Sequence, residues 1–210
     1  MTGSEIKTFA EGLLDDNVDW SDDHFYRLLN IAKTKLESMR LWQYLKKLNS
    51  SNAASSLAIS LPSDFSEDYK VLVGLDTEYY PVSFEEYPAY RNIAHRYYID
   101  WSALTINLLG TVNSGTLYLY YKKFTDDITS STSPSFPARF HPLLAYYVVA
   151  IHQSGTDSDD IFARMAPANR QAAYELERAM ISWDASIAMR MQNDRVGVSD
   201  SVHDVALGDM

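Results

Sequence analysis

Five scattered histidines are the first candidates for acid–base or metal chemistry in this 210-residue sequence. They are His24, His95, His141, His152 and His203. No two have the i, i+4 spacing that places two metal ligands on one helical face, and the HExxH motif is absent. The chain has no cysteine, which excludes thiolate metal sites and cysteine nucleophiles. We therefore predict no metal site.

The acidic residues do not nominate a catalytic centre either. Adjacent pairs are Asp15-Asp16, Asp22-Asp23, Glu85-Glu86, Asp126-Asp127 and Asp159-Asp160. Neighbouring residues point apart on a helix and on a strand, so such pairs rarely form one site. The GxSxG, GxxxxGK[ST] and GxGxxG motifs are absent. The sequence therefore predicts a protein that is not an enzyme and has no cofactor.

Tyrosine is the other residue type with chemical potential, and ten of the fifteen tyrosines lie between Tyr69 and Tyr121. Such rings can stack on sugars or bases. They are also enriched at protein interfaces. Alternating tyrosines are also typical of an antiparallel sheet with one face in water, which is the interpretation that the pattern favours. The pattern leaves these three interpretations open.

Charge is distributed unevenly along the chain. Residues 1–23 carry −6, residues 194–210 carry −3, and the 170 residues between them carry −1 of the total of −10. A general nucleic-acid binder needs basic residues to neutralise phosphates, and no basic patch is visible. The sequence therefore argues against general binding to nucleic acid.

The first half of the chain changes from helical to strand-like patterning. Residues 21–48 predict one long helix, because Ser21 can cap it, Asp22 and Asp23 lie in its first turn, and apolar residues recur every three or four positions. Residues 53–125 then favour strands, with a short helix within residues 84–93 and a hairpin turn at residues 113–115. The strand candidates are residues 57–61, 70–75, 79–83, 97–101, 104–109 and 116–122.

The second half returns to helical patterning after a Ser/Thr-rich loop at residues 125–137, which is flexible by composition. Residues 139–153 predict a helix that is apolar nearly all round, and therefore central in a bundle. A further helix is expected at residues 158–165, interrupted by Pro167, and a strong one at residues 169–191. Residues from 193 onward are polar and acidic and predict a flexible tail.

Together these elements predict an α+β fold: a bundle of about three to four helices with an inserted antiparallel β-rich lobe and a flexible C-terminal tail. The expected organisation is an acidic arm or short helix at residues 1–20, a bundle from residues 21–52 and 138–192, a β lobe at residues 53–137, and a tail at residues 193–210. No apolar run approaches the roughly 18 residues of a membrane span, so we expect no membrane contact and a cytoplasmic site of synthesis.

Read in order, these pieces resemble the head–tail adaptors of tailed bacteriophages, also called connector or head-completion proteins. The resemblance covers roughly residues 20–190 and rests on the order and spacing of several short patterns. They are FYRLLN at residues 25–30 with LW at 41–42, LPSDF at 61–65, GTLYLYY at 115–121 with FT at 124–125, PARFHPLL at 137–144, AAYE at 172–175 and WD at 183–184.

The resemblance implies a structural virion protein of the neck, assembled in the host cytoplasm. It implies a homo-oligomeric ring of about twelve subunits beneath the portal protein, a tail, stopper or nozzle protein on the other face, and genomic DNA passing through the lumen without specific binding. In such a ring the C-terminal tail would dock onto the portal, and we expect aromatic residues at the subunit interface. The portal-docking candidates are Val196, Val198, Val202, Val205 and Leu207, and the interface candidates are Trp42, Tyr118, Tyr120 and Trp183.

Two alternatives stay open beside the adaptor. One is a virion protein that binds or hydrolyses carbohydrate, using the tyrosine-rich lobe and a pair of facing carboxylates. The other is a cytoplasmic protein-interaction domain, which would be a monomer or dimer.

Overall fold

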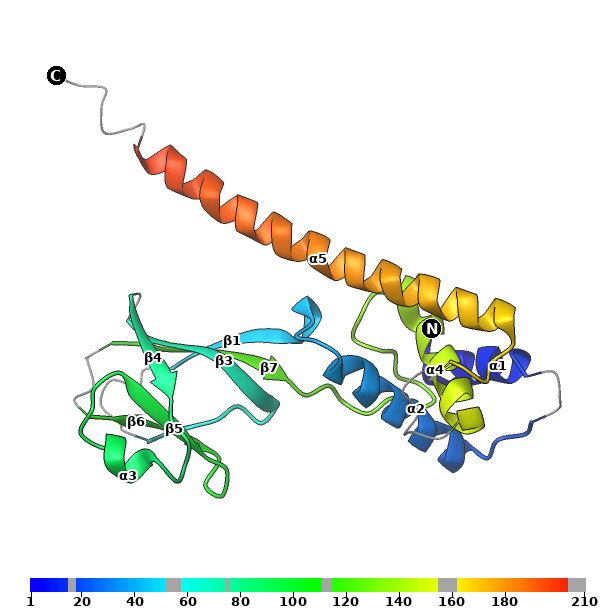
Figure 1. Cartoon of the computed structure of the whole chain (residues 1–210), viewed down its shortest axis with the longest axis horizontal. Coiled ribbons are helices and arrows are strands. Elements are labelled where there is room, and N and C mark those ends of the chain that lie inside the picture. The colour runs from blue at the N-terminus through cyan, green and yellow to red at the C-terminus, as the bar shows by residue number, and fades with distance from the viewer. Residues whose placement is uncertain (15–17, 52–57, 75, 111–114, 155–161, 204–210) are drawn as a thin grey trace. The chain divides into compact units, whose positions relative to one another are not determined.

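The chain folds into two compact units, seen in a computed structural model that describes residues 1–14, 18–51, 58–74, 76–110, 115–154 and 162–203 (Figure 1). Residues 1–44 and 126–210 form the first, which we call the helical unit. Residues 45–125 form the second, which we call the β unit. The predicted α+β class is confirmed. The β unit begins at Leu45, earlier than the predicted residue 53, and the loop after Thr125 belongs to the helical unit.

The helical unit is built around one apolar helix. Its helices are α1 (Gly3–Gly12), α2 (Asp22–Ser38), α4 (His141–Ser154) and α5 (Pro167–His203), with a short 3₁₀ turn, η2 (Ala138–Phe140), before α4. Every residue from 143 to 151 in α4 is buried, and α4 contacts α1, α2 and α5 (Figure 1). The prediction of a central apolar helix at residues 139–153 is thus confirmed.

Local sequence signals set where the first two helices begin. The Thr2 hydroxyl accepts a hydrogen bond from the Glu5 N–H while the Glu5 carboxylate accepts one from the Thr2 N–H, which forms a capping box for α1. Helix α2 starts after Ser21, with Asp22 and Asp23 in its first turn, as predicted. Its buried face consists of Phe25, Leu28, Leu29, Ala32, Lys33 and Leu36.

The helix predicted over residues 21–48 is wrong after Ser38. Helix α2 ends at Ser38, a 3₁₀ turn η1 follows at Gln43–Leu45, and β1 occupies Lys46–Ser51. Strand β1 pairs antiparallel with the strand β7 (Leu117–Lys123) over its whole length. This ladder overrides the helical spacing, since backbone pairing in a sheet outweighs weak intrinsic propensity.

The β unit contains one seven-stranded sheet in the order β1-β7-β3-β4-β5-β6-β2. The remaining strands are β2 (Ala58–Ser60), β3 (Phe65–Val73), β4 (Thr77–Pro81), β5 (Arg96–Asp100) and β6 (Thr105–Leu109), with the short helix α3 at Tyr87–Tyr90. All pairings are antiparallel except β4 with β5. The all-antiparallel prediction fails there because the segment containing α3 acts as a crossover, which parallel neighbours require.

Alternation along β7 separates two faces of the sheet. Leu117, Leu119 and Tyr121 are buried, whereas Tyr118 and Tyr120 lie on the opposite face and are half-exposed. The buried side joins one hydrophobic core, made of Phe65, Val71, Val73, Tyr79, Tyr97, Ile106, Leu108, Leu117, Leu119 and Tyr121. The predicted period of two thus identifies the core-facing residues of this strand.

A polar contact closes one end of that core. The Asp64 carboxylate accepts hydrogen bonds of 2.8 Å from the Tyr121 hydroxyl and 2.8 Å from the Lys47 ammonium. Burial pushes the pKa of Asp64 up, but the bonds from Lys47 and Tyr121 outweigh it, and the net pKa is below its ordinary value. The ionised carboxylate therefore holds β1 and β7 to the start of β3.

The C-terminal third differs from the sequence prediction in two places. Of the helix expected at residues 158–165, residues 162–165 form a turn and the rest lies outside the described residues. Helix α5 continues to His203 although a flexible tail was expected from residue 193, because extending an existing helix requires no new nucleus and no proline interrupts it. No helix within the described residues is both long and apolar enough to cross a membrane.

Asp64→Asn tests the contact at the end of the β core. Because the folded pKa is lowered, the ionised carboxylate stabilises the fold fully above the unfolded-state value near 3.8, and this contribution is lost as pH falls through the folded pKa. We expect the variant to lose about 1–2 kcal/mol of unfolding free energy at pH 7, with the difference from wild type shrinking below pH 3.8.

The measurement is urea unfolding across a range of pH, followed by the fluorescence of Trp101. The ring centre of Trp101 lies 5.7 Å from that of Phe65 in the β unit. Asp76→Asn, which removes an exposed carboxylate from the same unit, is the control and should have little effect. Equal losses in both variants would contradict a specific role for Asp64.

Candidate functional site

Trp42, one of the predicted interface residues, lies in the core. Its side chain is 0% exposed, and its Nε1 donates a 2.8 Å hydrogen bond to the carbonyl oxygen of Leu36 at the end of α2. The guanidinium carbon of Arg40 lies 5.3 Å from the centre of the ring. The structure therefore gives Trp42 a role inside the protomer, and this correction removes it from the candidate subunit interface.

A buried carboxylate on α5 fixes the turn that follows α2. Asp184 Oδ1 accepts a 2.6 Å hydrogen bond from the backbone N–H of Gln43. Asp184 Oδ2 lies 3.3 Å from a guanidinium nitrogen of Arg40, in an ion pair without hydrogen-bonding geometry. A carboxylate with no exposed surface is costly unless it is paired, so this contact specifies how α5 lies against the end of α2. Sequence reasoning missed it, since the partners are more than 140 residues apart.

Trp183 is positioned beside that carboxylate and is only partly covered. Its ring centre lies 5.6 Å from that of Phe140, and the Arg139 guanidinium carbon lies 6.0 Å from it. The ring is half-buried, so the protomer leaves part of it uncovered. Its assignment to a subunit interface stays a prediction.

The predicted portal-docking residues fall at the end of α5. Positions 196, 198 and 202 belong to the helix, whereas Val205 and Leu207 lie outside the described residues. Their assignment to the portal stays a prediction.

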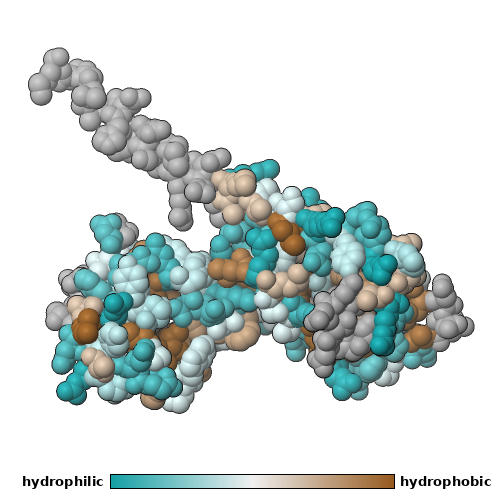
Figure 2. Space-filling model, in the orientation of Figure 1, coloured by the Kyte–Doolittle hydropathy of each residue, from teal (hydrophilic) through white to brown (hydrophobic). Residues whose placement is uncertain are grey.

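Large apolar side chains are exposed mainly on the β unit. Figure 2 shows brown, apolar residues among hydrophilic ones on the visible face of this unit. Within the described parts of the chain, the exposed large apolar residues of the β unit are Leu48, Tyr69, Tyr80, Phe84, Ile93, Trp101, Leu104 and Phe124. The predicted interface residues Tyr118 and Tyr120 lie between β1 and β3 on the outer face of the sheet.

A second aromatic group surrounds α3. The rings of Tyr87 and Tyr98 stack with centres 4.7 Å apart, and Phe84 packs against both at 5.9 Å. A sugar hydrolase would need two carboxylates facing each other across a cleft. The nearby Asp100 instead binds the hydroxyl and N–H of Ser102, and these hydrogen bonds lower its pKa. The hydrolytic alternative finds no support in this carboxylate.

In the helical unit, a groove of about 950 Å³ runs between α2 and residues 127–130. It mixes the apolar surface of Tyr26 and Ile31 with charges of both signs. Its lining residues are Asp23, Tyr26, Arg27, Asn30, Ile31, Thr34, Lys35, Ser38, Asp127, Ile128, Thr129 and Ser130. An open groove of this composition suits a protein segment better than a reacting small molecule.

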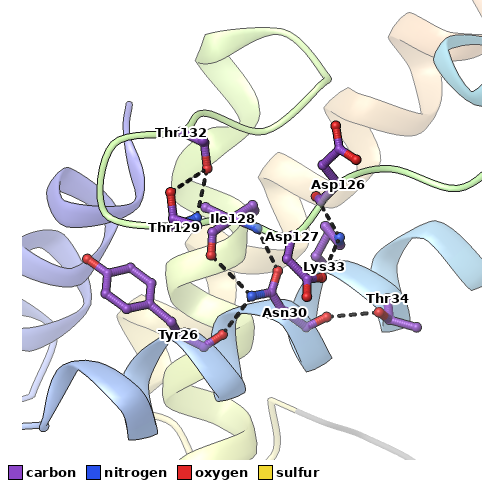
Figure 3. A network of polar contacts seen from close by, with 9 residues as sticks. All are labelled: Tyr26, Asn30, Lys33, Thr34, Asp126, Asp127, Ile128, Thr129 and Thr132. Carbon is purple, nitrogen blue, oxygen red and sulfur yellow. Dashed lines mark hydrogen bonds and ion pairs between the residues drawn. The ribbon is translucent and has the colours of Figure 1, made fainter.

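The wall of the groove is held by Asn30 (Figure 3). Its side-chain amide donates to the Ile128 carbonyl oxygen at 3.1 Å, and its Oδ1 accepts from the Ile128 N–H at 2.8 Å. One turn along α2, the Lys33 ammonium donates to the Asp126 carbonyl oxygen at 2.9 Å and pairs with Asp127 at 3.3 Å. The segment at residues 125–137, predicted to be flexible, is thus bound to α2 and buries Ile128 and Phe136.

The same segment is held from its other side by α1. The N–H groups of Gly3 and Ser4 donate to the carbonyl oxygens of Thr132 and Ser130, at 2.9 and 3.1 Å. A side chain at position 3 would overlap the Thr129 carbonyl oxygen, so only glycine permits this approach. The amide of Asn30 and the glycine at position 3 are the sequence signals for this arrangement, and neither stands out in a search by residue pattern.

The potential acid–base residues do not come together. His24 and His152 are the nearest histidines described, with ring centres 6.4 Å apart. His141 is buried, and its Nε2 lies 2.8 Å from the Phe136 carbonyl oxygen. Over the part of the chain that the structure describes, no cluster of three or more potential metal ligands forms. Asp15, Asp16, Asp159 and Asp160 lie outside it.

Comparison with known proteins gives one family match. A family model described as SU10 adaptor protein matches residues 1–199, almost the whole chain. A search of curated proteins returned no match.

Asn30→Ala tests the wall of the groove. Removing the amide leaves the N–H and C=O of Ile128 without these partners, and we expect a loss of about 1–3 kcal/mol of unfolding free energy in urea. The control is Thr34→Ala, since the Thr34 hydroxyl donates only to the Asn30 carbonyl oxygen within the same helix. That variant should stay within about 0.5 kcal/mol of wild type. A larger loss of unfolding free energy in Thr34→Ala than in Asn30→Ala would contradict the role of Asn30.

Proposed function

Since this chain belongs to the SU10 adaptor protein family, a family of phage head–tail adaptors, we propose that it forms a ring beneath the portal, joins the DNA-filled head to the tail and continues the DNA channel. The observation that carries the proposal is the family match over residues 1–199. The family is structural, and in this role the chain performs no catalysis. Its partners are further copies of itself, the portal protein and a tail, stopper or nozzle protein, and its place is the neck of the virion.

Charge supports a position around a DNA channel. Over residues 1–44 and 126–210 there are 20 acidic and 11 basic residues, or −9, and over residues 45–125 there are 8 and 7, or −1. A strongly acidic surface repels phosphate and keeps DNA from binding where it must slide. The resemblance implies a ring of twelve copies around a lumen. DNA would pass through this lumen without specific contact.

Helix α5 supports the portal contact. It has 37 residues, or about 55 Å of helix, whereas α4 has 14, or about 21 Å. Helix α4 can therefore cover only part of α5. We assign the end of α5 to the portal, with Val198 and Val202 as the apolar pair and with Val196, Val205 and Leu207 as further contacts. Trp183 and the outer tyrosines of β7 are assigned to neighbouring copies.

Mass photometry and negative-stain microscopy of the protein with isolated portal test this function. Wild type should form ring-sized complexes on the portal. Val198→Asp/Val202→Asp should weaken portal binding at least tenfold, because two charges enter an apolar contact.

The matched control is Ser199→Asp/Ser201→Asp, which adds the same two charges to the same stretch of helix. It should bind the portal as wild type does. If wild type ignores the portal, the adaptor function is refuted. If both variants bind equally well, the assignment of α5 to the portal is refuted.

A further inference from the structure

The outer face of β1, β7 and β3 carries three lysines around an apolar centre. Strand register places Leu48 of β1 and Lys70 of β3 on either side of Tyr120, and places Lys46 directly opposite Lys122. The residues between them along β7 point into the core, so this set lies on the side away from it. We call it the lysine–tyrosine face, defined by Lys46, Leu48, Lys70, Tyr118, Tyr120 and Lys122.

This face is unfavourable for an isolated β unit. Like charges directly opposite each other on a sheet destabilise the pairing, and Lys46 opposes Lys122. In the described part of the chain none of Lys46, Lys70 and Lys122 forms an ion pair, although Glu67 is the register partner of Lys122 on β3. Leu48, at the centre, is 48% exposed.

Lys47 shows what a lysine with an internal partner looks like on the same strand. It points to the other face, and its ammonium lies 2.8 Å from the Asp64 carboxylate. On the outer face, the Lys46 ammonium lies 5.7 Å from the centre of the Tyr69 ring, and within the described residues Lys70 and Lys122 form no ion pair. The face therefore presents cations beside aromatic and apolar surface. Such a face fits a partner that supplies carboxylates at the rim and apolar surface in the middle.

The acidic surface that this chain offers is the start of its own helical unit. Residues 1–23 carry −6. Asp19, Asp22 and Asp23 are exposed where α2 begins, and the Asp22 side chain is 71% exposed although it pairs with Lys7. The charges of these two surfaces are opposite, and in a ring every copy presents both.

We propose that the lysine–tyrosine face of one copy docks on the acidic start of α2 in the next copy around the ring. The inference rests on the proposed ring and adds to it which two surfaces meet. Lys46, Lys70 and Lys122 face the carboxylates, while Leu48 and Tyr120 bury apolar surface at the centre. Contact between surfaces of opposite charge steers each incoming copy into one orientation.

Nucleic acid is the competing ligand for a face of lysines and tyrosines. Two features favour protein: an exposed leucine lies at the centre of the face, and the chain as a whole carries −10. Phosphate binding would require the cations to dominate the surrounding field.

Two charge-reversed variants test the proposal by mixing. Variant A is Lys70→Glu/Lys122→Glu, and variant B is Asp19→Lys/Asp23→Lys. Each alone places like charges across every subunit contact, so each should assemble on the portal at least tenfold less than wild type in about 0.1 M salt. Mixed in equal amounts, A and B alternate with complementary contacts throughout and should assemble to within threefold of wild type.

The mixture separates the alternatives. A contact between a face and the acidic start of its own chain is not repaired by adding the other variant, so failure of mixing to restore assembly overturns the proposal. The control Arg91→Glu/Arg96→Glu makes the same change in charge elsewhere in the β unit and should assemble normally. If it loses assembly as variant A does, the effect is one of net charge, and the proposal is again overturned.

Two further measurements distinguish failure of the proposed contact from failure of the proposed ring. Wild type that forms no ring with portal refutes the proposed function, whereas wild-type rings that all variants form equally well refute only this contact. DNA binding is measured by fluorescence anisotropy with labelled single-stranded and duplex DNA. We expect wild type to show no DNA binding that is lost in variant A. Tight binding that depends on Lys70 and Lys122 would assign the face to nucleic acid and overturn the proposal.

Discussion

Helix α4 is the constraint on which the helical unit depends. All nine residues from 143 to 151 are buried, so no side of this stretch can face water. Each buried Leu, Ile or Val contributes roughly 1.5–3 kcal/mol, and that gain is realised only when other helices surround the segment. Helices α1, α2 and α5 therefore pack around α4. The segment held between α1 and α2 by Asn30 and Gly3 completes this enclosure.

The β unit is independent of this core, since its strands enclose a hydrophobic cluster of their own. The chain is thus divided into two units, and the stability of each depends on its own core. Each unit has a hydrophobic core of its own, and Trp183 and the outer tyrosines of β7 are only partly buried. The charges divide in the same way, with −9 on the helical unit and −1 on the β unit. A ring built from such copies has acidic and lysine-bearing surfaces in every subunit.

A dominant period predicted some elements but not all, since the helical spacing over residues 39–48 gave a wrong helix. The apolar run of α4 and the alternation in β7 were read correctly, because burial on all sides or on one face leaves a direct pattern. Contacts between residues far apart in the chain leave no such pattern in the sequence. Residues 46–51 join a strand paired about 70 positions away, the backbone of Gln43 binds Asp184 of α5, and Asn30 binds a segment that looks flexible by composition. The proposed contact residues were predictable only through the family resemblance, because no catalytic or metal-binding motif marks them.

The most direct test of the account is the copy number of this chain in purified phage particles, measured by quantitative mass spectrometry against the portal protein. An adaptor ring seated beneath the portal predicts that the chain is present in a fixed ratio of about one copy per portal subunit, with no excess in empty heads that lack a neck. Absence from particles, or an amount unrelated to that of the portal, would contradict the proposal that this protein joins head to tail.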